Sequence, residues 1–166
     1  MTEPQPGDIG LVRVAGVVGW AITIGELIYD GNWRQSHAFL YLGDGRVLEA
    51  QPGGARIAPL SEYNGRSVEC STRQPSAEER QSIVAIGESL VGVPYGWLDY
   101  ASLALWRFRI RLPAIRHRVN DGSNMICSQL VDYAWAGAGV HIFEDGREPG
   151  DVTPGDLARQ MHHGGL

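Results

Sequence analysis

The sequence predicts an α+β protein in which an antiparallel β-sheet packs against helices. Two patterns predict this class. Short runs rich in β-branched and aromatic residues, bounded by glycine, proline and aspartate, are typical of strands. Longer segments with apolar residues at spacings of three and four are typical of helices. The 166 residues fit one domain of ordinary size, so residues 1–166 are expected to form a single domain.

The first half of the chain is expected to supply the sheet. Residues 9–14 follow a Pro-Gly-Asp turn and form an apolar strand, and residues 17–29 have helical spacing. Residues 36–50, SHAFLYLGDGRVLEA, predict a β-hairpin that turns at the glycines and aspartate of positions 43–45. A third strand is expected near residues 66–72.

The second half is expected to be mainly helical. Ser76 and Glu79 form a capping-box pattern, and the helix after them should end near Gly92. Its predicted apolar face comprises Ile83, Ile86, Leu90 and Val91. Further helices are expected after Gly96, over residues 127–138 and from Thr153 to Arg159; His162 and His163 would lie in a frayed tail.

Charge excludes several functions. The net charge of −5 argues against a general nucleic-acid-binding protein, which needs an excess of cations. All fourteen cationic side chains are arginine, so neither a Schiff-base lysine nor a P-loop lysine exists in this sequence. No HExxH, CxxC or EF-hand spacing is present. We therefore expect neither a metal nor a cofactor.

The N-terminal residues contain no cationic segment followed by an apolar run, so no secretory signal is predicted. The longest apolar stretch, residues 14–29, is shorter than the roughly 20 residues that a membrane span needs. A cytoplasmic location, or release without a signal peptide, is the expectation. In a reducing compartment the two cysteines would be free thiols.

A thiol, a histidine and a carboxylate in the sequence are candidates for a catalytic site. Cys127 is placed where a helix should begin, and the helix N-terminus there favours a thiolate and offers amides to an oxyanion. The alternative is that Cys127 is a buried structural cysteine. Cys70 is the rival nucleophile, but the charge of Glu69 beside it would raise a thiol pKa. His117 and His141 have no nearby carboxylate in a predictable geometry.

His37 is the candidate base, and Glu49, on the partner strand, is the group that would orient it. The hairpin register decides whether they meet. A two-residue loop would pair Leu40 with Glu49 and place His37 on the opposite face. A three-residue loop, or a bulge with the same effect, would pair Phe39 with Glu49 and place both polar groups on one face.

Four blocks, PGDIGLV, SHAFLYLGDGRVLEA, GVPY and CSQLVDYAW, together resemble the NlpC-type papain-like cysteine peptidases of bacteria and phages. In those proteins the cysteine block usually precedes the histidine block. The reverse order here is similar to the circularly permuted branch, the YaeF/YiiX-like proteins. The resemblance implies a permuted papain-like fold with Cys127 as nucleophile, His37 as base and then acid, Glu49 as orienting group and Tyr95 near the oxyanion.

The resemblance also implies a substrate. The family acts on peptide, isopeptide or other amide bonds, and stem peptides of the bacterial cell wall are the expected partner. Two alternatives remain open. Permuted relatives similar to lecithin:retinol acyltransferase act on lipids, and the run from Arg107 to Arg118, with its neighbouring aromatic residues Trp97, Trp106 and Phe108, could contact an anionic membrane. The other alternative is a binding module with a vestigial triad.

Overall fold

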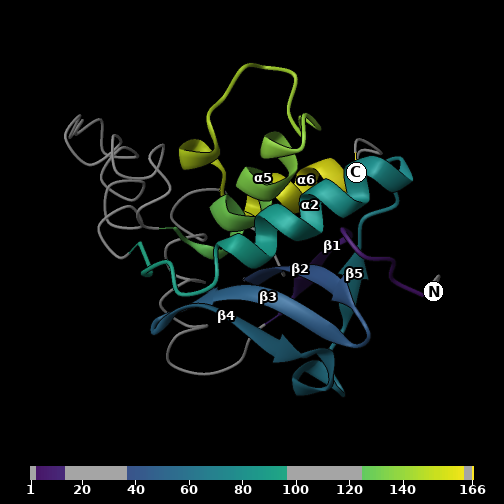
Figure 1. The fold of residues 1–166 in the computed structure, drawn as a ribbon, viewed down its shortest axis with the longest axis vertical. Helices are drawn as coiled ribbons and strands as arrows, with labels where there is room; N and C mark the ends of the chain where they lie inside the picture. The colour runs from purple at the N-terminus through teal and green to yellow at the C-terminus, as the bar shows by residue number, and fades with distance from the viewer. Residues whose placement is uncertain (1–2, 14–36, 97–124, 163–165) are drawn as a thin grey trace.

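The computed structural model describes residues 3–13, 37–96, 125–162 and 166 (Figure 1). These residues form an α+β structure with a five-stranded antiparallel sheet. The strands are β1 (Ile9–Val12), β2 (His37–Gly43), β3 (Arg46–Gln51), β4 (Gly54–Pro59) and β5 (Val68–Cys70), in the spatial order β4-β3-β2-β1-β5. Three α-helices are described: α2 (Ala77–Ser89), α5 (Cys127–Gly137) and α6 (Pro154–His162). Two 3₁₀ helices, η1 (Leu60–Tyr63) and η2 (Pro149–Asp151), complete the elements.

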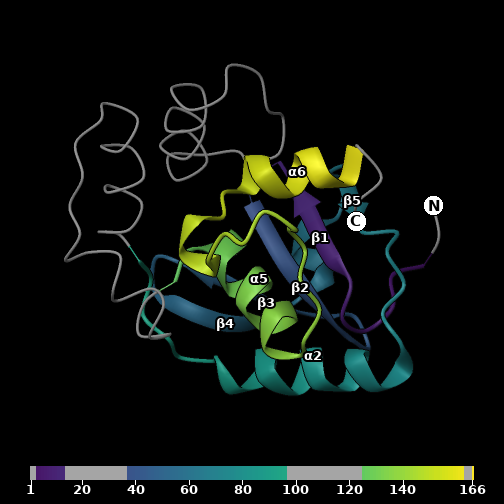
Figure 2. The ribbon, with the colours of Figure 1, turned by 90° about the horizontal axis from the view of Figure 1, so that it is seen from above.

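The three α-helices lie on one face of the sheet, and α5 lies between α2 and α6 (Figure 2). Alternate residues of β2, such as Leu40, join Leu130 and Trp135 of α5 in the larger apolar core. Trp135 also donates its indole N–H to the carbonyl of Gly7 over 3.0 Å. Gly87 allows α2 to approach the sheet closely, since a Cβ there would lie 2.6 Å from a methyl carbon of Leu40.

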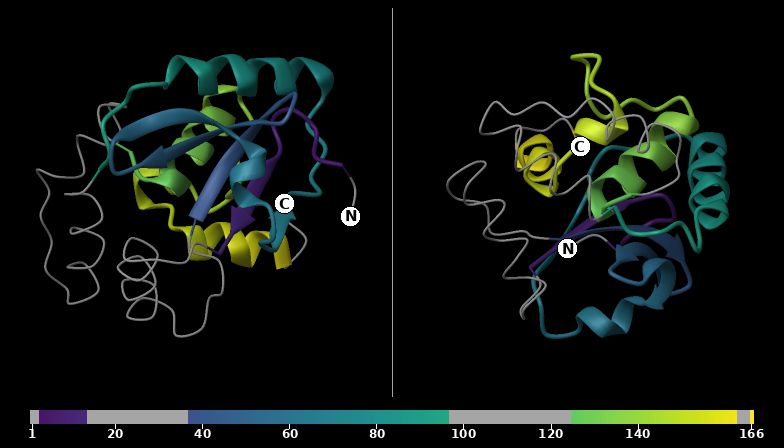
Figure 3. Two further views of the ribbon diagram at one scale, coloured as in Figure 1. Left: turned by 90° about the horizontal axis from the view of Figure 1, so that it is seen from below. Right: turned by 90° about the vertical axis from the view of Figure 1, so that its left-hand side faces the viewer.

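The opposite face of the sheet has a smaller core under η1 (Figure 3). Phe39 stacks on Tyr63 of η1 with ring centroids 5.3 Å apart. Gly10 makes room for Phe39 on the neighbouring strand, because a Cβ at Gly10 would lie 2.1 Å from the ring. This second core matters for the site because it fixes the position of Tyr63.

The hairpin between β2 and β3 combines the two geometries expected for it. Gly43 pairs with Arg46 across a two-residue turn of Asp44 and Gly45, both with positive φ. An irregularity between Tyr41 and Gly43 then shifts the register, so that Leu40 lies opposite Leu48. If the antiparallel pairing is continued by one residue beyond Leu40 and Leu48, Phe39 lies opposite Glu49. The bulge therefore puts His37 and Glu49 on one face of the sheet.

The predicted strands at residues 9–14 and 66–72 are confirmed as the shorter β1 and β5. The capping box of Ser76 and Glu79 is present, with both hydrogen bonds formed. The helices predicted over residues 17–29 and after Gly96 lie outside the described residues.

One strand was missed and two expectations were wrong. β4 was not predicted, because GARIAP alternates poorly between apolar and polar residues. Val91, expected on the apolar face of α2, is 48% exposed because the helix has already ended at Ser89. The last helix, α6, continues through His162, which was expected in a frayed tail. None of the described helices combines the length and the apolar character that crossing a membrane requires.

Candidate active site

His37 and Glu49 meet as the shifted register requires. The Nε2 atom of His37 lies 2.7 Å from Oε2 of Glu49. Both residues are buried, and Glu49 is fully inaccessible. His37 is the first residue of β2, and Glu49 is near the end of the antiparallel β3, so the two side chains share one end of the hairpin.

The same carboxylate oxygen receives two further hydrogen bonds. Tyr63 donates its hydroxyl to Oε2 of Glu49, and Gln51 donates its side-chain amide to the same atom over 3.0 Å. Tyr63 reaches Glu49 because η1 folds over the face of the sheet that carries Phe39. Glu49 is therefore held from three directions.

Arg56 contacts the second oxygen of Glu49. It stands opposite Glu49 in the pairing of β3 with β4, and its Nη2 lies 2.7 Å from Oε1. The contact is an ion pair without hydrogen-bond geometry, so within the described part of the chain Oε1 has no hydrogen-bond donor. Arg56 is half-exposed and also pairs with Glu62 over 2.6 Å.

These contacts outweigh burial in setting the ionisation of Glu49. Burial alone would raise the pKa of this carboxyl. The hydrogen bonds from His37 and Tyr63, the positive charge on His37 and the bond from Gln51 instead lower the pKa of Glu49 to about 2. Burial, followed by the hydrogen bond to Glu49 and the charge of Glu49, raises the pKa of the Tyr63 hydroxyl, which stays protonated as a donor.

His37 is held in its charged form. Burial lowers its pKa, but the negative charge and hydrogen bond of Cys127, followed by the hydrogen bond and charge of Glu49, raise the pKa from 6.5 to about 9. Since Nε2 faces Glu49, Nδ1 is the ring nitrogen left for Cys127. The structure thus brings the three predicted residues together in the order thiol, imidazole, carboxylate.

Cys127 is the first residue of α5 and is buried, with 2% of its surface exposed. The amides of the first helical turn have no carbonyl four residues earlier within the helix, so they can receive an anion. Gln129 turns back to accept from the amide of Ile126 over 3.0 Å and donates to the carbonyl of Gly150 over 2.9 Å. Ser128 donates to the carbonyl of Val152 over 2.7 Å, which ties the start of α5 to the chain before α6.

Tyr95 approaches the nucleophile through the backbone. It forms a parallel bridge with Met125, two residues before Cys127, and its side chain packs against the larger core. The bridge is flanked by bonds from the Gly96 amide to Met125 and from the Met125 amide to Pro94, both 3.1 Å long. The role of its hydroxyl beside an oxyanion stays a prediction.

The rival residues are placed elsewhere. Cys70 lies on β5, and burial, followed by the charge of Asp8, raises the pKa of its thiol. The imidazole of His162 is 3.7 Å from Glu69, and His141 is an exposed residue of the chain between α5 and η2. His117 and the whole run from Arg107 to Arg118 lie outside the described residues. Across the described ranges, no three histidine, cysteine or acidic side chains are grouped so as to hold a metal ion.

Tyr63, Gln51 and Arg56 were missed in the sequence. Arg56 could have been found, because Pro52-Gly53-Gly54 is a turn signal and a second hairpin would have placed Arg56 opposite Glu49. Tyr63 carries no local pattern of its own. The available signal was general: a carboxylate buried on a strand needs donors beyond one histidine.

No protein-family model matches the chain, and no curated protein matches it. The function is therefore inferred from the geometry of the site and from the resemblance of the four sequence blocks.

Proposed function

We propose that the protein is a thiol-dependent hydrolase of amide bonds that uses Cys127, His37 and Glu49 as a catalytic triad. The observation that carries this proposal is the buried His37, bonded to Glu49 over 2.7 Å, with its pKa raised to about 9 in part by Cys127. A protonated imidazole beside a cysteine at a helix N-terminus is the arrangement in which a thiolate is stabilised near neutral pH.

The reaction follows from these positions. The Cys127 thiolate attacks the carbonyl carbon of the amide, and the resulting oxyanion accepts from amides at the start of α5. His37 gives its proton to the leaving nitrogen, the C–N bond breaks, and a thioester remains on Cys127. A water molecule then gives a proton to His37 and attacks the thioester, which releases the acid and restores the thiolate. Glu49 keeps the imidazole oriented and stabilises its charge throughout.

The proposed fold is the permuted papain-like one, and the proposed substrates are peptide or isopeptide bonds of bacterial cell-wall stem peptides. Both come from the resemblance of the four sequence blocks. The order of the elements supports the fold: the hairpin bearing His37 and Glu49 precedes the helix bearing Cys127, and the three side chains still meet. Triads are defined by position in space and tolerate any chain order.

The test is digestion of purified cell-wall peptides, followed by mass spectrometry of the products. Wild type should release new amino and carboxyl termini, and Cys127→Ala should lower the rate by about 10⁴-fold or more, since without the nucleophile only binding and oxyanion contacts remain. Cys70→Ala is the matched control because it removes the other thiol, and it should retain wild-type activity. Absence of cleavage by wild type would refute the peptidase proposal.

A second measurement separates a working triad from a vestigial one. In the Cys70→Ala background, iodoacetamide reports on Cys127 alone, and a thiolate reacts faster near neutral pH than a model thiol. Labelling no faster than the model thiol would favour the binding module.

A further inference from the structure

A cavity of about 540 Å³ lies on the side of α5 that faces the chain between α5 and η2. Asp132 of α5 lines it, together with Glu144, Arg147 and Glu148. Ala136, Ile142 and Pro149 supply apolar wall. Cys127, His37 and Glu49 do not line this cavity, so it is separate from the proposed catalytic site.

Asp132 is the unusual member of the lining. It is 5% exposed, and among the described residues its side chain forms no hydrogen bond or ion pair and is influenced only by the charge of Arg147. Burial raises the pKa of its carboxyl to about 6, and the charge of Arg147 offsets this only in part. A buried carboxylate ordinarily has partners, because desolvation without them is costly. Asp132 is therefore a largely buried carboxyl that lines a cavity and has no described protein partner.

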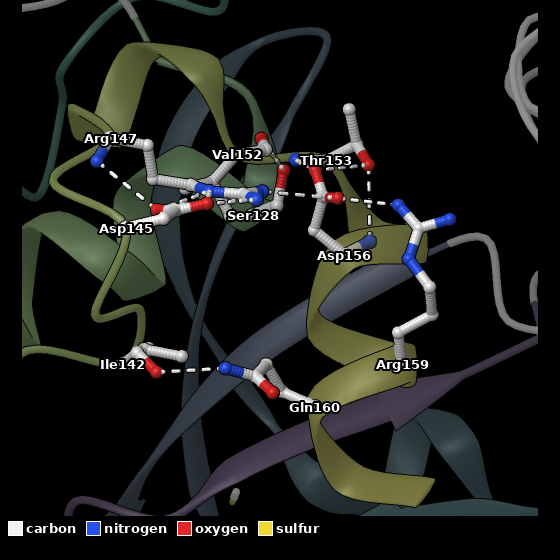
Figure 4. Close-up of polar contacts among 9 residues, drawn as sticks. All are labelled: Ser128, Ile142, Asp145, Arg147, Val152, Thr153, Asp156, Arg159 and Gln160. Atoms are coloured by element: carbon white, nitrogen blue, oxygen red, sulfur yellow. Dashed lines mark hydrogen bonds and ion pairs between the residues drawn. The ribbon is translucent and has the colours of Figure 1, made fainter. Parts of the chain in front are cut away.

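Arg147 does not neutralise Asp132, because it is bound elsewhere. Its guanidinium contacts the Asp145 carboxylate at 2.6 Å and Asp156 at 3.1 Å, as Figure 4 shows. It also stacks on Phe143, with Cζ 4.3 Å from the ring centroid. Asp156 is shared further with Arg159 over 2.5 Å. The lining contains three carboxyl groups, those of Asp132, Glu144 and Glu148, and its arginine is already paired with other acids. The cavity lining therefore carries an excess of negative charge.

We propose that this cavity binds the primary ammonium group of a small aliphatic amine, with Asp132 as its buried counter-ion. An ammonium group supplies the hydrogen-bond donors that Asp132 lacks, and the apolar wall suits a short methylene chain. A metal ion is disfavoured because no three metal-ligating side chains in the described ranges converge on one point. The volume of about 540 Å³ leaves ample room for a lysine side chain or a free diamine.

The test is a titration of the full chain with n-butylammonium, followed by ¹H–¹⁵N NMR, with 1-butanol as an uncharged ligand of matched shape. Butylammonium should shift the signals of residues lining the cavity saturably at millimolar concentrations, and 1-butanol should not. Asp132→Asn should weaken binding at least tenfold. Glu88→Gln, which removes one exposed carboxylate from α2, should bind as wild type.

A second readout needs no change at Asp132. Wild-type affinity should fall as the pH is lowered through about 6, because protonated Asp132 loses its charge. The other charged or titratable residues that line the cavity are His141, Arg147, Glu144 and Glu148. The same pH dependence should persist in His141→Gln, a variant that leaves the other three residues in place. Equal shifts with 1-butanol, equal affinity in Asp132→Asn, or no saturable shifts at all would each overturn the proposal.

Discussion

Glu49 and Asp132 are both buried carboxyls, and their pKa values are shifted in opposite directions. Glu49 is fully buried and has a pKa near 2, whereas Asp132 is 5% exposed and has a pKa near 6. Burial favours the protonated form of both. The difference is in the partners: Glu49 accepts from His37, Tyr63 and Gln51, and Asp132 accepts from no described residue.

The comparison shows how partners within the protein decide the charge of a buried acid. Oε2 of Glu49 accepts from three side chains and Oε1 is ion-paired with Arg56, so the group is fixed and can orient a base. Asp132 has no cationic partner bound to it among the described residues, and an external ligand can supply one. Removing the charge should therefore have opposite effects on stability at the two positions.

The largest effect is expected for Glu49→Gln. This change leaves His37 without its counter-ion, and it should lower kcat by about 10³- to 10⁴-fold, as expected for loss of the orienting acid of a triad. It should also lower the free energy of unfolding by about 3 kcal/mol, because a buried pair is broken on one side only. Peptide cleavage and urea denaturation measure the two quantities. Unchanged stability would mean that Glu49 is not held as described.

Asp132→Asn should act in the other direction on stability. The folded-state pKa of Asp132 is raised, so its ionisation costs stability as the pH rises from about 4 to about 6, and the cost is constant above that range. At pH 7, without an amine ligand, the variant should be more stable than wild type by about 3 kcal/mol, and the gain should vanish near pH 4. Urea denaturation at the two pH values checks this, and a loss of stability at pH 7 would contradict an unpartnered carboxylate.

A smaller effect is expected for Tyr63→Phe. The variant removes one of the donors to Glu49 and keeps the ring that stacks on Phe39, so it should cost about 1–3 kcal/mol of stability and raise the pKa of Glu49. Carbon NMR of the Glu49 carboxyl measures that pKa. Tyr41→Phe is the matched control, since the Tyr41 hydroxyl accepts from the Gly45 amide and does not contact Glu49. Equal shifts of the Glu49 pKa in both variants would remove Tyr63 from the site.

The contrast between the two acids also marks what the sequence could predict. Cys127, His37 and Glu49 were recognisable because a helix start and a hairpin give them a geometry from local patterns. The register of the hairpin could not be predicted, because its turn residues are compatible with a two-residue turn either with or without a bulge. The structure has both a two-residue turn and a bulge between Tyr41 and Arg46. Only the packing of the sheet decides between these arrangements.

Asp132 and Tyr63 could not be predicted in the same way. The helical pattern over α5 identifies an apolar face, and nothing in that spacing indicates that Asp132 is buried. It is buried because the chain from Val140 to Val152 folds back over α5, a contact between segments that no local spacing encodes. Tyr63 reaches Glu49 from a 3₁₀ helix on the far side of the sheet, for the same kind of reason.

The central claim is that Cys127, His37 and Glu49 act as one charged unit, and an NMR titration of the His37 ring nitrogens tests it most directly. Because the folded-state pKa is raised, the stability that His37 contributes is complete below pH 6.5 and is lost as the pH rises through about 9. Wild type should titrate near 9, and Cys127→Ala should titrate clearly lower, because the charge and hydrogen bond of the thiolate are gone. A His37 that titrates near 6.5 in wild type, or identically in both proteins, would contradict the triad.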